Sequence, residues 1–161
     1  MPAANKLVVL LDLARRLVLA IAGKLAWLPP LLARAVVGFI FVESGWGKLH
    51  NLSFIIDRFR EWGIPYPQIQ APFSAGTELV CGALLLAGLL SRIAAVPLVV
   101  VMIVAICKVK LDPTSTLDDF LGFEEFHYIL LLLWIAIAGP GPISLDRIAG
   151  PWIARRSGKE T

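Results

Sequence analysis

Hydrophobic residues in this chain gather in four long stretches that polar residues rarely interrupt, at positions 31–49, 72–90, 93–109 and 126–143. Crossing the hydrocarbon core of a bilayer, roughly 30 Å thick, takes about 20 mostly apolar helical residues. Each stretch is close to that length, so the pattern predicts four membrane-spanning helices. The second and third stretches are almost contiguous, and we expect them to form a tight antiparallel hairpin.

Two further segments are amphipathic rather than uniformly apolar. Within residues 6–28, polar residues recur at spacings that bring them to one face of a helix: Asp12, Arg15, Arg16 and Lys24. This pattern is typical of a helix that lies in the membrane interface, with Trp27 at the level of the headgroups. A cleaved signal peptide or a fifth span fits less well, because the uncharged runs are short and no small-residue cleavage site follows.

The segment from Leu52 to Trp62 (LSFIIDRFREW) repeats this pattern between the first two spans. Its apolar and charged positions alternate with helical spacing, which predicts a second, shorter interfacial helix. A helix that caps the bundle in water is the alternative for this segment.

Composition places the chain in the membrane class. Of the 161 residues, 58% are hydrophobic and 17% are charged, and the mean hydropathy is +0.78. No soluble fold of this size can bury so much apolar surface. The expected fold is all-α: an integral membrane four-helix bundle at residues 31–148, preceded by the amphipathic helix in residues 1–30 and followed by a basic cytoplasmic tail at residues 149–161.

Lysine and arginine are distributed unevenly around the predicted spans. Ten of the 15 fall on the side that holds both termini, and the other side carries Lys48, Arg58, Arg60, Lys108 and Lys110. Because positive residues are retained in the cytoplasm, both termini are expected to be cytoplasmic, in a bacterial or archaeal cytoplasmic membrane. The net charge of +3 calls for lipid contact but for no nucleic-acid partner.

Two carboxylates, Glu43 and Glu78, lie inside the first and second predicted spans. A charged side chain near the centre of a bilayer costs roughly 2.5 to 3.5 kcal/mol on insertion scales, so it usually faces a protein interior or an aqueous cavity. The antiparallel topology puts both glutamates at similar depth in the outer half of the bundle. Lys108 near the end of the third span and His127 at the start of the fourth fall in the same half.

These four residues, Glu43, Glu78, Lys108 and His127, are the candidate catalytic set. Two carboxylates, an ammonium and an imidazole can form a proton relay or a ligand site, and a purely structural hydrogen-bonded network is the alternative. We predict that a flat ring bound there would contact the residues that flank the set, namely Trp46, Tyr128 and Cys81.

A metal site is not predicted. Glu124 and His127 resemble the Glu-x-x-His element of di-iron bundles, but such sites use the element twice and this chain contains it once. Cys81 and Cys107 lack C-x-x-C spacing, and burial in apolar surroundings makes a thiol inert, so packing is the favoured role for both.

Three blocks of the sequence carry a resemblance to a known family: VGFIF at 37–41 with SGWGKL at 44–49 and WGIP at 62–65; Glu78-Leu79 with residues 82–92; and GPG at 139–141 followed by SLDR at 144–147. Together they resemble the DoxX family. The resemblance implies a four-helix integral membrane protein that acts beside other proteins in electron transfer or oxidant defence. Relatives include the DoxD subunit of thiosulfate:quinone oxidoreductase, and the resemblance makes Glu78 a family trait.

The function expected from residues and resemblance together is a quinone-interacting subunit of a membrane redox complex, in electron transfer or in oxidant or sulfur metabolism. It would act with a protein partner or as a homo-oligomer, as an oxidoreductase subunit rather than as a self-sufficient enzyme. The first alternative is a non-catalytic membrane anchor or scaffold that recruits a partner. A small-solute carrier is the second, although four helices without internal inversion offer little for alternating access.

Overall fold

The computed structural model describes residues 2–111 and 116–147, with residues 2–7 described by their backbone. Within these ranges every regular element is a helix: α1 (Pro2–Leu25), α2 (Leu28–His50), α3 (Leu52–Glu61), α4 (Pro67–Ala87), α5 (Ser91–Ala105) with the π-helical turn η1 (Ile106–Lys110), α6 (Leu117–Gly122) and α7 (Glu124–Ala138). The all-α fold class is therefore confirmed. The predicted basic tail at 149–161 lies outside the described residues.

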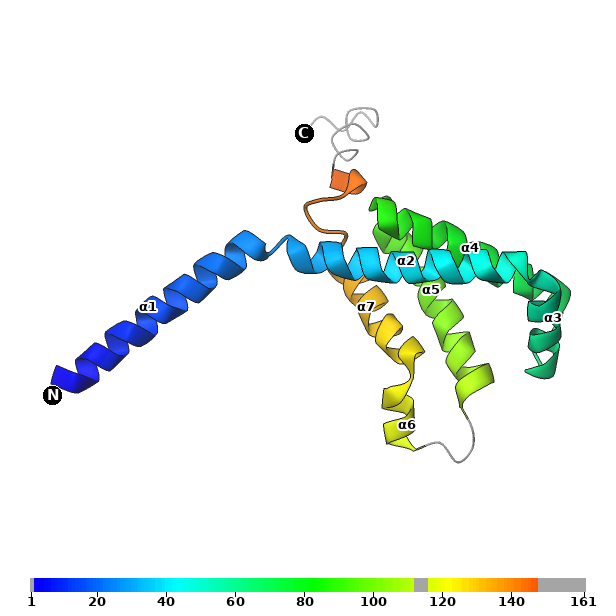
Figure 1. Cartoon of the computed structure of the whole chain (residues 1–161), viewed down its shortest axis with the longest axis horizontal. Helices are drawn as coiled ribbons and strands as arrows, with labels where there is room; N and C mark the ends of the chain where they lie inside the picture. Colours follow the sequence, from blue (N-terminus) through cyan, green and yellow to red (C-terminus); the bar gives the residue numbers. More distant parts are fainter. Residues whose placement is uncertain (1, 112–115, 148–161) are drawn as a thin grey trace, which may run out of the picture.

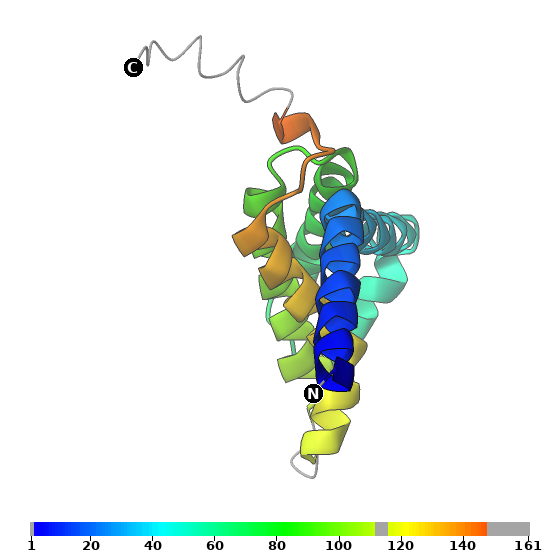
Figure 2. The ribbon, with the colours of Figure 1, turned by 90° about the vertical axis from the view of Figure 1, so that its left-hand side faces the viewer.

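The first helix stands apart from the rest. Figures 1 and 2 show α1 projecting away from the bundle, with a break of two residues before α2 begins. Its large apolar side chains are open along its whole described length, from Val8 at 61% exposure to Leu25 at 46%. The sequence predicted a separate amphipathic helix here, and the structure shows a separate helix that no other part of the described chain covers.

The tightest packing in the bundle joins α2 and α4, which lie side by side in Figure 1. Three glycines line their contact. A Cβ atom added to Gly45 would lie 2.5 Å from the backbone nitrogen of Leu79, and one added to Gly82 would lie 2.8 Å from the backbone nitrogen of Val42. One added to Gly38 would meet the α4 backbone at 2.9 Å. Small residues let helix backbones approach closely, as is common between membrane helices.

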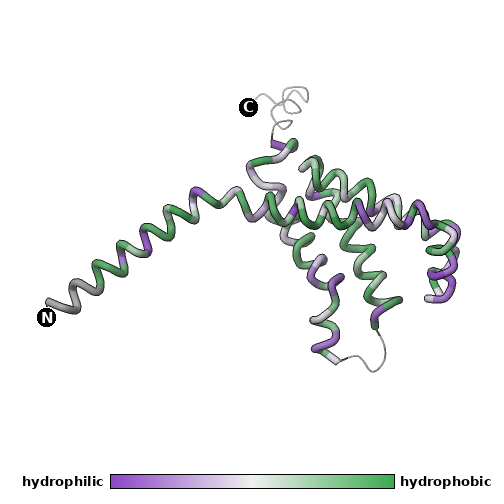
Figure 3. Tube along the Cα trace, in the orientation of Figure 1, coloured by the Kyte–Doolittle hydropathy of each residue, from purple (hydrophilic) through white to green (hydrophobic). Residues whose placement is uncertain are grey.

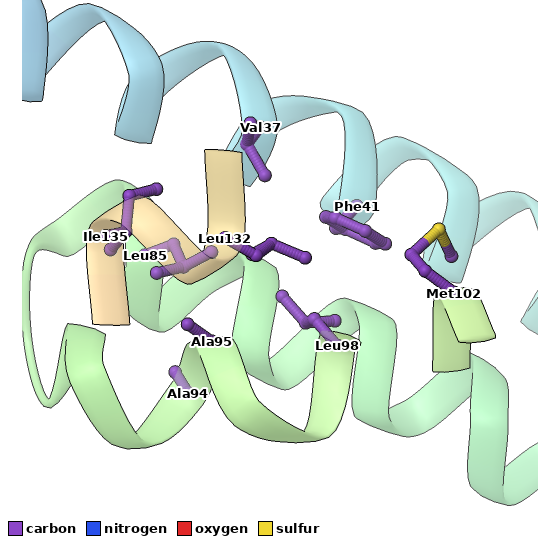
Figure 4. Packing of buried hydrophobic residues seen from close by; sticks show 9 residues of the cluster. All are labelled: Val37, Phe41, Leu85, Ala94, Ala95, Leu98, Met102, Leu132 and Ile135. Carbon is purple, nitrogen blue, oxygen red and sulfur yellow. The ribbon is translucent and has the colours of Figure 1, made fainter. Parts of the chain in front are cut away.

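Helices α5 and α7 close the bundle on the other side of this pair. The core where the four helices meet is apolar and is drawn in Figure 4: Val37 and Phe41 from α2, Leu85 from α4, Ala94, Ala95, Leu98 and Met102 from α5, and Leu132 and Ile135 from α7. Hydrophobic residues dominate α5 and all of α7 after its first turns, whereas hydrophilic residues mark α3 and α6 (Figure 3). The core is thus formed by all four predicted spans.

Within the described residues, three helices are long and apolar enough to cross a membrane: Leu28–His50, Pro67–Ala87 and Ser91–Lys110. They correspond to the first three predicted spans, although α4 begins five residues before the predicted start and contains Pro72 in its first turns. The fourth predicted span, at 126–143, closes with Gly139-Pro140-Gly141-Pro142, a sequence that stops helices. Helix α7 has 15 residues and ends at Ala138, directly before this stop, because Gly139 adopts φ +88°, which a continuing right-handed helix excludes.

The residues that follow α7 fold back over the N-terminal part of α2. The guanidinium of Arg34, 3% exposed, donates hydrogen bonds to the carbonyl oxygens of Pro140 (2.9 Å) and Ile143 (2.8 Å). The Asp146 carboxylate accepts from the backbone N–H groups of Leu90 (2.6 Å) and Ser91 (3.2 Å), where α5 begins. These contacts satisfy otherwise unpaired donors at a helix start and hold the chain after α7 against the bundle.

Candidate functional site

The α2–α4 contact contains a buried charged cluster centred on Glu78, near the C-terminal end of α2. The Glu78 side chain is fully buried. Its two carboxylate oxygens accept hydrogen bonds from Lys48 Nζ at 2.5 and 2.6 Å, and Oε2 also accepts from Ser44 Oγ at 2.8 Å. Ser74 Oγ lies 3.4 Å from Oε1. Such charge-assisted hydrogen bonds are the strongest class in proteins, and they compensate the burial of the carboxylate.

Helix geometry explains how these groups meet. Ser44 and Lys48 are four residues apart on α2, so they lie one above the other on the same face. Gly45, between them, packs against the backbone of α4, which draws this face of α2 onto the turn that carries Glu78. Ser74 lies four residues before Glu78 on α4 and contacts it from the previous turn.

Lys48 connects the buried cluster with the surface. Its side chain is 29% exposed while its partner Glu78 is 0% exposed. An open groove of about 650 Å³ begins at this point, between α2 and the start of α3, and is lined by Ile40, Glu43, Ser44, Gly47, Lys48, Asn51, Phe54 and Ile55. Two residues that bind Glu78, Ser44 and Lys48, thus also face the groove. Its walls combine apolar side chains with an ammonium, a carboxylate and an amide.

Glu43 lies on the far side of α2 from Glu78. It is exposed, and it is one of the residues that line the groove. By helical spacing, Glu43 shares a side of α2 with Phe39, Trp46, Gly47 and His50. All five residues are exposed, so this side of α2 points away from the bundle.

Lys108 and His127 are not among the partners of Glu78 in the described part of the chain. Lys108 is exposed on η1. His127 is exposed on α7, and its Nδ1 lies 2.9 Å from the backbone oxygen of Phe123. The ion pair that links these two elements is formed by their neighbours, Lys110 and Glu125, at 3.7 Å. The structure therefore does not bring the four expected residues together: Glu78 is buried, whereas Glu43, Lys108 and His127 are exposed on three different elements.

The three predicted ring contacts are divided as well. The Trp46 ring is 57% exposed and stacks on His50 at a centroid distance of 4.3 Å, on the outward side of α2. Tyr128 packs edge to face on Phe41 at 6.0 Å, and Cys81 is partly buried against the same core. Tyr128 and Cys81 therefore lie within the helix packing beneath the charged cluster, while Trp46 faces away from it.

Sequence reasoning missed Lys48 as the main partner of Glu78. It was counted only as a positive residue outside the membrane, because it lies near the end of its span. One available signal was the four-residue spacing of Ser44 and Lys48 across Gly45, which puts two hydrogen-bond donors on the close-packed face of α2.

Metal coordination has no support in the described ranges, where no group of three or more His, Cys, Asp or Glu side chains is placed to hold an ion. Both cysteines are free thiols, Cys81 partly buried and Cys107 exposed.

Comparison with known proteins agrees with the resemblance read from the sequence. A sequence model of the DoxX family matches residues 30–111, which include Ser44, Lys48 and Glu78. "Uncharacterized membrane protein Rv3486" of Mycobacterium tuberculosis is 36% identical over 126 residues, covering 71% of this chain and 77% of that protein. "Putative oxidoreductase CatD" of Bacillus subtilis is 35% identical over 118 residues, covering 72% and 83%. No solved structure matches the chain. The chain is an integral membrane protein and belongs to the DoxX family.

Proposed function

We propose that the protein is a quinone-binding subunit of a membrane redox complex, with the quinone ring in the groove beside Lys48 and Glu78. The observation that carries this proposal is that Ser44 and Lys48 bind the buried Glu78 carboxylate and also line the open groove. A buried ionisable pair inside a membrane bundle is a functional-site candidate by default. The oxidoreductase in the name of the Bacillus subtilis relative supports a redox role.

Each group has a role in this proposal. Reduction of a quinone to a quinol takes two electrons, supplied by a partner subunit, and two protons. The Lys48 ammonium would stabilise negative charge that develops on a quinone oxygen at the floor of the groove. The Glu78 carboxylate, which accepts two short hydrogen bonds from Lys48, would hold the ammonium in place, and water in the open groove would supply the two protons of reduction; in the reverse direction Glu78 would accept a proton from the quinol. Phe54 and Ile55 would pack against the ring.

We also propose the membrane arrangement that the sequence indicated. The fourth span is α7 together with the short segments that flank it, because α7 packs along α5 and contributes Leu132 and Ile135 to the core that the other spans share. Helices α1 and α3 then lie in opposite interfaces, with both termini on the cytoplasmic side, where most of the lysine and arginine is found.

The test compares quinone binding by the purified parent with that of Glu78→Gln, using a benzoquinone that carries a single isoprene unit. Glutamine keeps the shape of the side chain but removes its charge, and we expect an increase in Kd of about ten- to hundredfold, as for the loss of a charged hydrogen bond. Glu61→Gln on the exposed end of α3 is the matched control and should bind normally. Equal affinity in parent and Glu78→Gln, with both folded, would refute the proposal.

An anchor or scaffold is the second candidate, and one observation favours it. From Val8 to Leu25, helix α1 presents a surface that the described chain leaves uncovered, and such a helix can hold a membrane surface or a partner. Deleting residues 2–25 separates the two functions. If the truncated protein no longer co-purifies with its partner but still binds quinone, α1 recruits the partner. If it keeps both the partner and quinone binding, the anchor hypothesis is rejected.

A further inference from the structure

The outward side of α2 carries a carboxylate in an otherwise apolar setting. Its exposed residues repeat at spacings of three and four along the helix and form one stripe: Leu32 (52% exposed), Val36 (53%), Phe39 (60%), Glu43 and Trp46 (57%). We refer to these five residues as the Glu43 face. It points away from the close-packed contact that Gly38 and Gly45 make with α4.

Glu43 lies well inside the span. It precedes His50, the last residue of the 23-residue helix α2, by seven positions, or roughly 10 Å at 1.5 Å per residue. Among the residues that the structure describes, no side chain forms a hydrogen bond or an ion pair with it. A carboxylate open to hydrocarbon at this depth is costly, and membrane proteins normally pair it with a group of opposite charge.

We propose that the Glu43 face is the docking surface for a transmembrane helix of another protein, which presents a lysine or arginine to the Glu43 carboxylate. Charge complementarity sets the chemistry of this partner, since a cation at the same depth neutralises Glu43 and the apolar rest of the face packs on an apolar helix. Phe39 and Trp46 flank the carboxylate by three to four residues and supply large contact surfaces above and below it.

A second copy of this chain is a poorer occupant. Two copies inserted in the same direction and related by a two-fold axis would bring identical faces together. Glu43 would then oppose the Glu43 of the other copy, and like charges in a low-dielectric medium repel. The inference concerns a different face from the quinone groove, although Glu43 also lines the groove, and it holds whether or not a quinone binds there.

The experiment replaces Phe39 by the photoreactive amino acid p-benzoylphenylalanine and irradiates the full-length protein in the membranes of its native host. A matched control carries the same replacement at Val96, which is 57% exposed on the outer side of α5. We expect a discrete protein adduct from position 39 and lipid adducts from position 96. Mass spectrometry of the adduct should map the cross-link to a membrane helix that contains a lysine or arginine within about one turn.

Charge exchange then tests the ion pair. Glu43→Lys should lower the adduct yield by about three- to thirtyfold, the range expected for one interhelical polar contact. Replacing the partner's basic residue by glutamate should restore the yield with Glu43→Lys. Glu43→Gln, which is less disruptive to insertion, should lower the yield in the same direction. The quinone-binding test with Glu78→Gln, which leaves every residue of the Glu43 face unchanged, separates failure of this inference from failure of the proposed function.

Three outcomes would overturn the proposal. The first is an adduct at position 39 that consists only of lipid. The second is an adduct with a second copy of the chain. The third is a partner whose cross-linked helix has no basic residue, or whose charge-reversed form fails to rescue Glu43→Lys while both variants are folded and inserted.

Discussion

Two buried charges lie near opposite ends of α2, and their surroundings differ. Arg34 is held by backbone carbonyl oxygens of the chain after α7, at 2.9 and 2.8 Å, and is sealed from solvent at 3% exposure. Glu78 is held by side chains, and its main partner Lys48 is 29% exposed beside an open groove. One charge is enclosed by the main chain, while the other is connected to the surface through a flexible counter-ion.

This difference separates a structural contact from a candidate chemical site. A guanidinium does not lose its proton in proteins, so Arg34 can fasten the chain but cannot exchange protons. A carboxylate and an ammonium can both change protonation state, and Lys48 can turn toward a ligand in the groove. Burial alone does not distinguish Arg34 from Glu78, because both are buried. Their hydrogen-bond partners distinguish them, and so does the solvent exposure of Lys48, the counter-ion of Glu78.

The largest effect should come from separating the Glu78 ion pair. Lys48→Met leaves the buried carboxylate without its counter-charge, and we expect a loss of about 3 kcal/mol in unfolding free energy, the lower end for buried pairs because Lys48 is partly exposed. The double variant Lys48→Met/Glu78→Leu should recover most of this loss, yet bind no quinone. Unfolding in mixed micelles with increasing SDS measures both. A double variant as unstable as the single one would mean that the pair serves the fold.

Removing the other buried charge should affect a different part of the molecule. Arg34→Met deletes two hydrogen bonds to the carbonyls of Pro140 and Ile143, and we expect a loss of about 1.5 to 3 kcal/mol. The effect should appear as faster amide hydrogen exchange at Asp146, whose N–H bonds to Gly88. Quinone affinity should stay at the parent value. A large fall in quinone affinity would show that the Arg34 contacts and the Glu78 cluster are coupled.

The close approach of α2 to α4 underlies the Glu78 cluster and can be tested by adding one methyl group. Gly45→Ala puts a Cβ 2.5 Å from the Leu79 nitrogen and 2.7 Å from the Ala75 oxygen, so a backbone must move. We expect a cost of about 1 to 3 kcal/mol from overpacking, with weaker quinone binding. Gly76→Ala is the matched control, because its Cβ meets nothing within 4 Å. It should be neutral, or stabilising by up to about 1 kcal/mol through helix propensity.

The smallest effect is expected at the start of α5. Asp146→Ala removes the acceptor for the Leu90 and Ser91 N–H groups, and loss of a capping acceptor costs typically about 1 kcal/mol. Amide exchange at Leu90 should accelerate, whereas Asp118→Ala on the exposed helix α6 should leave it unchanged. If Asp146→Ala destabilised the protein more than Arg34→Met, the Asp146 cap rather than the Arg34 guanidinium would be the main contact that holds the chain after α7 against the bundle.

The apolar pattern was enough to locate the helices of the bundle core, α2, α4, α5 and α7. Starts and ends of α2 and of the α5–η1 segment fall within three residues of the predicted spans. The fourth predicted span, at 126–143, includes Gly139-Pro140-Gly141-Pro142, which the sequence indicates as a helix stop, and α7 ends directly before these residues at Ala138. The short helix α6 was not predicted, because six residues carry too little periodicity to be recognised.

The site was predicted only in part. Glu78 was expected to face a protein interior or an aqueous cavity, and it is fully buried between α2 and α4. Depth along a helix grouped Glu43, Lys108 and His127 with it, but depth says nothing about rotation around the neighbouring helices. Each of the three residues is exposed, and among the described residues none of the three forms a hydrogen bond with Glu78.

The sequence by itself determined the membrane class, the positions of the spanning helices and the family, because a span depends on local hydropathy and on hydrogen bonds within its own segment. Only the tertiary structure decided which charges meet. The contact of Gly45 with the α4 backbone turns Ser44 and Lys48 toward Glu78 and leaves Glu43 outside. That choice depends on the rotation of each helix and the distance between them, and helix packing sets both quantities across residues far apart in the chain.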